Sequence, residues 1–290
     1  MGKLTKIMAV VSIVLLCMGS IALADLADIK ARGVIRHIGV PYANFVTGSG
    51  DGMSVDIVKL FAKEIGVEYK FVKSSWGSIF SDLTGMKVKS DGSNVRIIGS
   101  APVKGDLIAN GLTILPWRQK LVNYAIQTFP TQVWMLTRAD SEAQPVIPSG
   151  DINKDIINVK KSVQGKTVFG VPGTCLDPLL YSLKEAGIEP VHFKGNLNEL
   201  APAVINKDAY GTILDVPDSL VALEKWPGQL KILGPVSSEQ GMAVGFPKRS
   251  VKLLDEFNAF IKKIKKDGTY LKIIKKYYPA ALIYYPEFFK

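Results

Sequence analysis

The chain has 290 residues, of which 47% are hydrophobic, and its 36 lysines and arginines outnumber its 26 aspartates and glutamates. This composition excludes an intrinsically disordered chain, and the length suffices for one large domain or two modest ones. Only two cysteines and two histidines occur, without partners at ligand spacing, so we expect no disulfide framework, no metal centre and no cofactor.

Residues 1–24 form the first predicted element, a secretory signal peptide. Two lysines precede an apolar run over residues 7–18, and small residues lead up to a cleavage site after Ala24. An uncleaved anchor is the alternative, for which the run is short, and Cys17 raises a lipoprotein interpretation that the bulky residue before it disfavours. We therefore expect a soluble, exported chain in the periplasm or elsewhere outside the cytoplasm. Its net charge is then +8, because removing two lysines lowers the formal value of +10.

The remaining chain alternates short strands with amphipathic helices, which is typical of an α/β fold with mainly parallel sheets. The helix predicted over residues 56–66 has Ser54 as a candidate N-cap. Strands are predicted at residues 34–40, 67–72, 106–114, 123–138, 165–171, 189–193, 210–216 and 242–246. Further helices are predicted at residues 74–85, 173–187 and 196–209, and a long helical segment near the C-terminus is interrupted at Asp267 and Gly268.

Two polar segments interrupt this pattern. Residues 86–103 are rich in Gly, Ser, Asn and Asp and predict a surface hairpin or loop. Residues 139–156 predict a loop between two structural units.

The densest group of basic residues lies at residues 262–276. A nucleic-acid surface is one interpretation. Apolar residues alternate with these lysines at helical spacing, so we interpret the group as the solvated face of a helix and expect no nucleic-acid partner.

Taken together, the segments resemble the amino-acid-type extracellular solute-binding proteins of family 3, the receptor components of ABC importers. The resemblance covers nearly all of the mature chain. Its segments in chain order are residues 51–66 (DGMSVDIVKLFAKEIG), 104–129 (KGDLIANGLTILPWRQKLVNYAIQTF), 163–183 (VQGKTVFGVPGTCLDPLLYSL), 212–223 (TILDVPDSLVAL) and 242–279, the closing helix pair.

The resemblance implies a two-lobe, periplasmic-binding-protein-like fold of type II, with the ligand held in a cleft between the lobes. It implies that residues 25–134 and 236–290 form lobe one, which the chain enters twice, and that residues 135–235 form lobe two. Hinge closure around the ligand is the implied motion.

The implied site holds an amino acid or a similar small carboxylate. Arg118 matches the family arginine that binds the carboxylate, Thr113 matches a hydroxyl position, and Gly111 allows close approach of the backbone to the ligand. Thr174 and Cys175 fall where the lobe-two helix is predicted to begin, where free N–H groups favour an anion. Asp215 matches the aspartate that accepts from the ligand ammonium group.

Tyr42, Phe45 and Trp76 match positions that line the side-chain pocket of relatives, although each is equally compatible with packed core. Trp117 either lines the pocket or braces the turn. The segment over residues 39–45 (GVPYANF) contains no acidic residue, so we expect an apolar, aromatic or small polar ligand side chain rather than a cationic one.

The sequence departs from the family pattern at Met53, Ser54 and Gly77, and residues 86–103 have no family counterpart, which makes the chain a divergent member and leaves the ligand open. The resemblance implies a monomer that delivers a small ligand to ABC transporter permease subunits, without catalysis. A dehydratase-like enzyme acting on a cyclic carboxylate, with Glu239 or Asp215 as general acid, and a ligand-sensing receptor remain alternatives.

Overall fold

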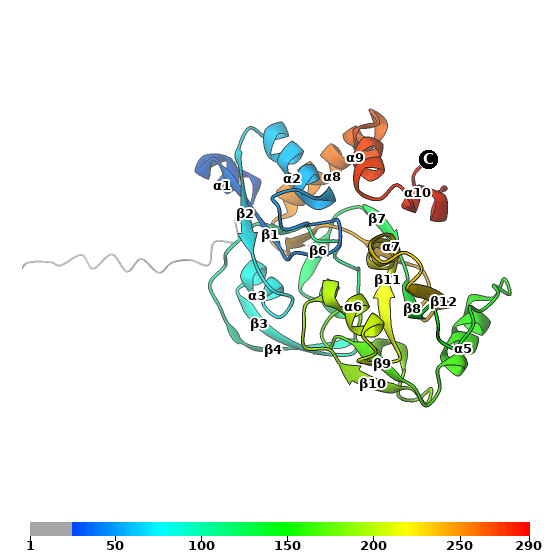
Figure 1. Cartoon of the computed structure of the whole chain (residues 1–290). Helices are drawn as coiled ribbons and strands as arrows, with labels where there is room; N and C mark the ends of the chain where they lie inside the picture. The colour runs from blue at the N-terminus through cyan, green and yellow to red at the C-terminus, as the bar shows by residue number, and fades with distance from the viewer. Residues whose placement is uncertain (1–24) are drawn as a thin grey trace, which may run out of the picture.

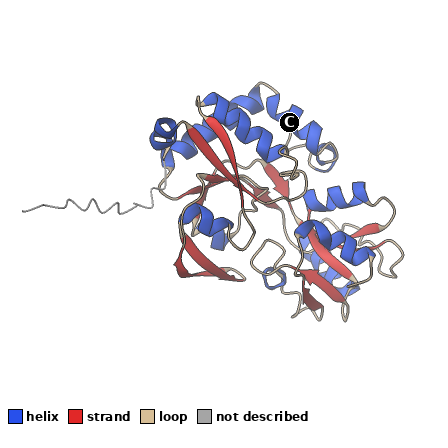
Figure 2. Cartoon of the chain, turned by 60° about the vertical axis from the view of Figure 1, so that its left-hand side comes forward, coloured by secondary structure: helices blue, strands red, loops and turns tan. Residues whose placement is uncertain are grey.

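The structure, a computed structural model, describes residues 25–290, and the predicted signal peptide lies outside the described residues. Residues 25–290 form two five-stranded sheets, each with its own helices, and two sheets of two strands (Figure 1). Figure 2 shows the two groups of helices and strands as separate bodies joined by extended chain. The predicted two-lobe α/β architecture is therefore confirmed.

The first large sheet draws strands from both ends of the described chain. In spatial order its strands are β2 (Glu68–Lys73), β1 (Val34–Gly39), β5 (Leu107–Ile108), β14 (Gly245–Pro247) and β6 (Val122–Tyr124). β1 runs parallel to β2 and β5, whereas β14 is antiparallel to β5 and β6. The chain therefore returns to this sheet after leaving it for more than a hundred residues.

The second large sheet is continuous in sequence. In spatial order its strands are β10 (Glu189–His192), β9 (Thr167–Gly170), β11 (Gly211–Asp215), β8 (Val133–Arg138) and β12 (Leu230–Pro235). β9 is parallel to β10 and β11, while β8 is antiparallel to β11 and β12. In each sheet four of the five strands thus run in one direction, as expected for mainly parallel sheets, and a single strand, β14 or β8, runs antiparallel to both of its neighbours.

Two short strands connect these bodies. β7 (Phe129–Thr131) pairs antiparallel with β13 (Gln240–Met242) between the two large sheets. The Thr113 backbone adds a bridge to Met242, so the segment before Arg118 is attached to one of the connecting strands. The predicted lobe limits at residues 134 and 235 remain predictions.

Helices cover both sheets, and α1, α2, α8 and α9 lie together above the first sheet in Figure 1. The α-helices are α1 (Leu26–Arg32), α2 (Met53–Glu64), α3 (Ile79–Thr84), α4 (Pro116–Gln119), α5 (Ile152–Ser162), α6 (Leu200–Ile205), α7 (Val216–Lys225), α8 (Val251–Lys266), α9 (Thr269–Tyr277) and α10 (Ala281–Tyr284). The 3-10 helices are η1 (Pro178–Tyr181) and η2 (Leu197–Glu199).

The lysine-rich C-terminal helices pack as their spacing predicts. Phe257, Phe260 and Ile261 of α8 are buried, whereas the two lysines that follow them are exposed, and one of these, Lys263, pairs with Glu64 at 2.7 Å. The break between α8 and α9 falls at the predicted position, where Gly268 adopts a φ of 79°.

Other local predictions needed correction. The helix predicted over residues 173–187 is wrong, because only the four residues of η1 are helical there. Ser54 lies inside α2, whose N-cap is Gly52. The predicted strand over residues 106–114 shortens to β5, because Gly111 turns the chain with a φ of 59°. The loop predicted over residues 139–156 ends earlier, since α5 begins at Ile152.

The polar segment at residues 86–103 forms a hairpin, which is one of the two structures that its sequence predicts. β3 (Met86–Asp91) pairs antiparallel with β4 (Asn94–Ser100), and the pair forms a sheet of its own. In Figure 1 the hairpin lies below α3 and extends toward β9 and β10.

Candidate ligand-binding site

Arg118 lies in α4, a single helical turn that begins immediately after the extended Leu115. Pro116 occupies the first helical position, where its fixed φ is compatible with the turn and its missing N–H has no cost. The Arg118 side chain is 1% exposed. Its Nη1 donates to the Thr113 carbonyl at 3.0 Å, and its guanidinium carbon lies 5.2 Å from the Trp117 ring and 5.7 Å from the Phe80 ring. The arginine is thus held by its own turn and by aromatic rings.

The remaining donors of this group are unused. Nε and Nη2 of Arg118 are buried and have no hydrogen-bond partner among residues 25–290, and the same holds for the Thr113 hydroxyl. An unpaired buried N–H group costs about 1–3 kcal/mol, and more when it is charged. A carboxylate oriented along one edge of a guanidinium accepts two parallel hydrogen bonds. The arrangement therefore lacks the anionic acceptor that would satisfy it.

Asp215 is the last residue of β11 and the N-cap of α7. Its side chain is 0% exposed, and Oδ1 accepts from the Asp218 backbone N–H at 3.3 Å. Oδ2 accepts from the Tyr42 hydroxyl at 2.5 Å and from the Cys175 thiol at 3.6 Å. Burial raises the pKa of Asp215 to about 6, against the opposing effect of the Tyr42 hydrogen bond. Both carboxylate oxygens of Asp215 are therefore engaged by protein groups.

The bond between Tyr42 and Asp215 crosses from one body to the other, because Tyr42 follows β1 of the first sheet and Asp215 ends β11 of the second. Tyr42 is 1% exposed. Cys175 adds a second contact: burial raises the pKa of its thiol to about 12, so the thiol stays protonated and can donate. The Thr113 hydroxyl opposes this rise in the pKa of Cys175, but the two groups are not in hydrogen-bonding geometry. Tyr42, Thr113, Arg118, Cys175 and Asp215 thus meet between the bodies.

Gly111 and Phe45 have a different placement from the one implied. A Cβ on Gly111 would lie 2.4 Å from carbons of the Phe45 ring. Phe45 is buried and packs on Phe129 and Tyr278, with ring centroids 5.5 Å and 5.1 Å away. The small size of Gly111 therefore accommodates Phe45, and the structure places Phe45 in the core.

Thr174 is not at the beginning of a helix. Its hydroxyl donates to the Val171 carbonyl at 2.7 Å and accepts from the Leu176 N–H at 3.0 Å. Asp177 caps η1 and also accepts from the Gly173 N–H at 3.0 Å. The N–H groups of Gly173, Thr174 and Leu176 are therefore engaged within the chain, that of Gly173 by an acidic side chain. The signal was the sequence Asp177-Pro178, an N-cap followed by proline at the first helical position.

A cavity of about 360 Å³ is lined by Phe80 and Trp117, the two rings that pack on Arg118, although Arg118 itself does not line it. Its first wall consists of Trp76, Phe80 and Trp117 with Gly77, and its second wall of residues 171–174. Val88, Lys89 and Ser90 of β3 form the third wall. Trp117 is buried and its ring lies 5.1 Å from that of Phe80, so it both lines the cavity and braces the turn. We call this cavity the side-chain chamber.

Sequence reasoning missed Phe80 and the three β3 residues of the chamber. The alternation in MKVKSD (residues 86–91) was a signal, because every second residue of β3 is partly buried. Trp76 lines this cavity, and its indole Nε1 is buried without a hydrogen-bond partner within residues 25–290.

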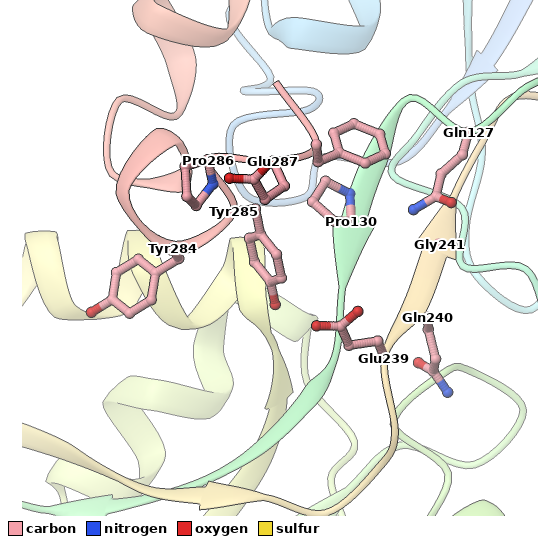
Figure 3. Close-up of a pocket in the computed structure, with 10 residues that line it drawn as sticks. Gln127, Pro130, Glu239, Gln240, Gly241, Tyr284, Tyr285, Pro286 and Glu287 are labelled. Carbon is pink, nitrogen blue, oxygen red and sulfur yellow. The ribbon is translucent and has the colours of Figure 1, made fainter. Parts of the chain in front are cut away.

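A larger cavity of about 650 Å³ lies elsewhere, between the connecting strands and the C-terminal segment (Figure 3). Glu239 and Tyr285 point toward one another there, next to Tyr284 and Glu287. Tyr42, Arg118 and Asp215 line neither cavity, but the walls of the larger one also lack Phe80 and Trp117, the rings that contact Arg118. The structure therefore places Glu239, the candidate general acid, in a separate and exposed position.

No helix of residues 25–290 has the length and apolar character that a membrane span requires.

Solved structures with the same fold include a mutant of ArgBP from T. maritima (24% identity, TM-score 0.69) and the ancestral amino acid-binding protein AncCDT-1, described as a precursor of cyclohexadienyl dehydratase (23% identity, TM-score 0.67). They align with 88% and 87% of this chain and with 99% of their own. At these identities the likeness shows the fold alone.

A curated relative is the membrane-bound lytic murein transglycosylase F of Desulfosudis oleivorans, 24% identical over 233 residues. The aligned part is 79% of this chain and 44% of that protein, so the chain spans less than half the length of this relative. The sequence profile of the bacterial extracellular solute-binding proteins, family 3, matches residues 84–280, well over half of the chain. The chain belongs to this family of solute-binding proteins.

Proposed function

We propose that this chain is the solute-binding receptor of an ABC importer, and that it binds a small carboxylate, such as an amino acid, by closing its hinge. The observation that carries the proposal is the pair of unused donors on Arg118, Nε and Nη2, buried between the two bodies beside the unused Thr113 hydroxyl. Two charge-assisted hydrogen bonds from a carboxylate to one edge of the guanidinium would satisfy both nitrogens.

Asp215 is the partner proposed for an ammonium group. Its carboxylate is buried and has a hydroxyl and a thiol as its nearest side-chain donors. A ligand ammonium is a stronger donor than either, and it would join or replace the Tyr42 hydroxyl on Oδ2. An α-amino acid suits this arrangement because it carries an ammonium and a carboxylate on the same carbon. A ligand between the two residues would pair its carboxylate with Arg118 and its ammonium with Asp215.

The ligand side chain is proposed to be apolar, aromatic or small and polar. The walls of the side-chain chamber include three aromatic rings and one cation, Lys89, and contain no carboxylate. A cationic ligand side chain would be desolvated there without an anionic partner, at a high cost. Arginine, which is bound in a structure of truncated ArgBP from T. maritima, is therefore not the ligand proposed for this chain.

The proposed location is the periplasm or another compartment outside the cytoplasm, reached through cleavage of the predicted signal peptide over residues 1–24. The proposed partners are the permease subunits of an ABC transporter, and the proposed working form is a monomer. A sensing receptor would use the same ligand-binding step.

We propose that the site does not catalyse a reaction. A dehydratase needs a general acid in reach of a bound carboxylate. Glu239 lines the separate cavity in Figure 3, and Asp215 is already engaged by three donors. Turnover of prephenate or arogenate that is lost in a Glu239→Gln variant would contradict this part of the proposal.

Isothermal titration of residues 25–290 tests the proposal with three matched sets of compounds. These are the L-amino acids, the same acids without the amino group, and the corresponding amines without the carboxylate. We expect the first set to bind best, the second more weakly and the amines not at all. If no carboxylate binds folded protein with a Kd below about 1 mM, the proposal is wrong.

A further inference from the structure

The β3–β4 hairpin is attached at its base to the lobe-one side of the molecule. It begins directly after α3, where the Ala101 N–H donates to the Gly85 carbonyl at 2.8 Å and closes the base. β4 packs against α4, the turn that carries Arg118. The position of the hairpin is therefore fixed relative to the proposed carboxylate site.

The far end of the hairpin contacts the second body. A Cβ built on Gly173 would lie 3.4 Å from the Ser90 hydroxyl, and a Cβ on Gly92 would lie 3.7 Å from Cβ of Leu179. Gly173 belongs to the loop after β9, and Leu179 belongs to η1. The hairpin thus extends from the first body to the second, as its course in Figure 1 indicates.

Between these two ends, the inner face of β3 forms a wall of the side-chain chamber. Val88 and Ser90 are the partly buried residues of the alternating pattern, while Lys87 and Asp91 are exposed. Opposite them stand Trp76, Phe80 and Trp117. Without the hairpin, this side of the chamber would open to solvent.

The chemistry of the walls restricts the ligand. Aromatic rings pack favourably against other rings at offset or edge-on geometry, beyond the area that they bury. The chamber offers three such rings, an apolar valine, the cation Lys89 and no carboxylate, and its volume of about 360 Å³ falls within the range of small-ligand pockets. The unused Trp76 Nε1 is one further donor at the wall.

We propose that the β3–β4 hairpin is the specificity element of this binding site, and that it selects carboxylates with a planar aromatic side chain. The ring lies between Val88 and the aromatic wall, and a hydroxyl or other acceptor on the ligand accepts from Trp76 Nε1. The contacts of Ser90 and Gly92 with the second body make chamber formation part of hinge closure. This inference rests on the proposed carboxylate-binding function.

Titration with L-phenylalanine, L-tyrosine and L-alanine tests the inference on residues 25–290. Val88→Trp fills the chamber, and we expect it to weaken phenylalanine and tyrosine binding by about tenfold or more while alanine binding changes by less than about threefold. Lys87→Trp is the matched control, because it adds the same side chain to the neighbouring, exposed position. We expect it to leave all three affinities unchanged.

Circular dichroism and the melting temperature would reveal a folding defect in Val88→Trp. A second variant keeps the inference testable in that case. Residues 88–98 are replaced by Asn-Gly, a two-residue hairpin turn that keeps the base of the hairpin. We expect the ratio of phenylalanine to alanine affinity to fall by about tenfold or more.

The outcomes separate the two proposals. If the wild-type chain binds alanine as tightly as phenylalanine, or if both hairpin variants keep the wild-type affinity ratio, the hairpin inference is wrong while carboxylate binding stands. If no carboxylate binds the wild-type chain, the proposed function fails and the inference fails with it.

Discussion

The polar side chains on the two sides of the proposed site differ in their hydrogen bonding. We call the side with Arg118 and Thr113 the lobe-one wall and the side with Thr174 and Asp215 the lobe-two wall. On the lobe-one wall, Arg118 and Thr113 are buried with donors that nothing in the described chain accepts. On the lobe-two wall, Thr174 and Asp215 are buried as deeply, and hydrogen bonds within the chain engage both of them. The side chains of the first wall have unpaired donors, whereas the polar side chains of Thr174 and Asp215 on the second wall are paired.

This difference indicates an order of events. Unsatisfied donors cost free energy that a ligand anion recovers, so the lobe-one wall should capture the carboxylate. The lobe-two wall contributes Asp215 and its surrounding donors only when the bodies approach. Lobe-two polar groups other than Asp215 should then affect stability more than affinity. Three experiments test this comparison.

Arg118→Met should have the largest effect. We expect affinity for any carboxylate ligand to fall about a hundredfold, since about 3 kcal/mol of charge-assisted hydrogen bonding is lost. The unliganded variant should be as stable as the wild type or more stable, because it no longer buries a cation with two unpaired donors. Titration gives the affinity and thermal unfolding gives the stability.

Arg138→Met is the matched control, because Arg138 pairs only with the exposed Asp140. Arg138→Met should change neither the carboxylate affinity nor the thermal stability by much. Retained carboxylate binding in Arg118→Met would contradict the assignment of the carboxylate to the lobe-one wall.

The sequence predicted the lobe-one wall better than the lobe-two wall, and the reason is physical. Arg118 follows a proline turn whose geometry is local, so its position could be inferred from neighbouring residues. The place of Asp215 in the chain could be inferred for the same reason, because it lies at the junction of a strand and a capped helix. Thr174 was misplaced because helical spacing of leucines outweighed Asp177-Pro178, the local signal for a later start.

Long-range packing accounts for the remaining errors. Gly111 was assigned to a ligand contact, but the Phe45 ring that it accommodates comes from more than sixty residues away, which no local pattern reveals. The hairpin was recognised as a surface segment, yet its contact with Gly173 depends on how the two bodies approach one another. Tertiary contacts of this kind decide which polar residues become a site.

Asp215 should produce the next largest effect, through pH. Burial raises its pKa to about 6, and the groups facing it are Tyr42, Cys175, Asp218 and Arg118. Burial and the nearby Asp215 charge also raise the pKa of Asp218, to well above its usual value. Because the folded-state pKa of Asp215 exceeds its unfolded value, Asp215 takes up a proton as pH falls through about 6. That protonation stabilises the folded protein without ligand, but it removes the anion with which a ligand ammonium group would pair.

We therefore expect amino-acid affinity to fall about tenfold between pH 7 and pH 5, while the same acid without its amino group keeps its affinity. Titrations at both pH values measure the two ligands side by side. Asp215→Asn should bind the amino acid weakly and without this pH step. An equal loss for both ligands would show that the titrating group does not contact the ammonium.

A pair of threonines gives the smallest and sharpest comparison. Thr113→Val removes an unused hydroxyl from the lobe-one wall, so it should leave the melting temperature unchanged and reduce carboxylate affinity by about fivefold, or about 1 kcal/mol.

Thr174→Val removes a hydroxyl that bonds Val171 and Leu176, so it should destabilise the chain by about 1 kcal/mol and change affinity little. Denaturant unfolding without ligand and titration with ligand separate the two quantities. The opposite pattern, a stability loss at Thr113 and an affinity loss at Thr174, would mean that the lobe-two wall captures the carboxylate. In that case the donors left unpaired on Arg118 would need another acceptor, and the order of events on closure would reverse.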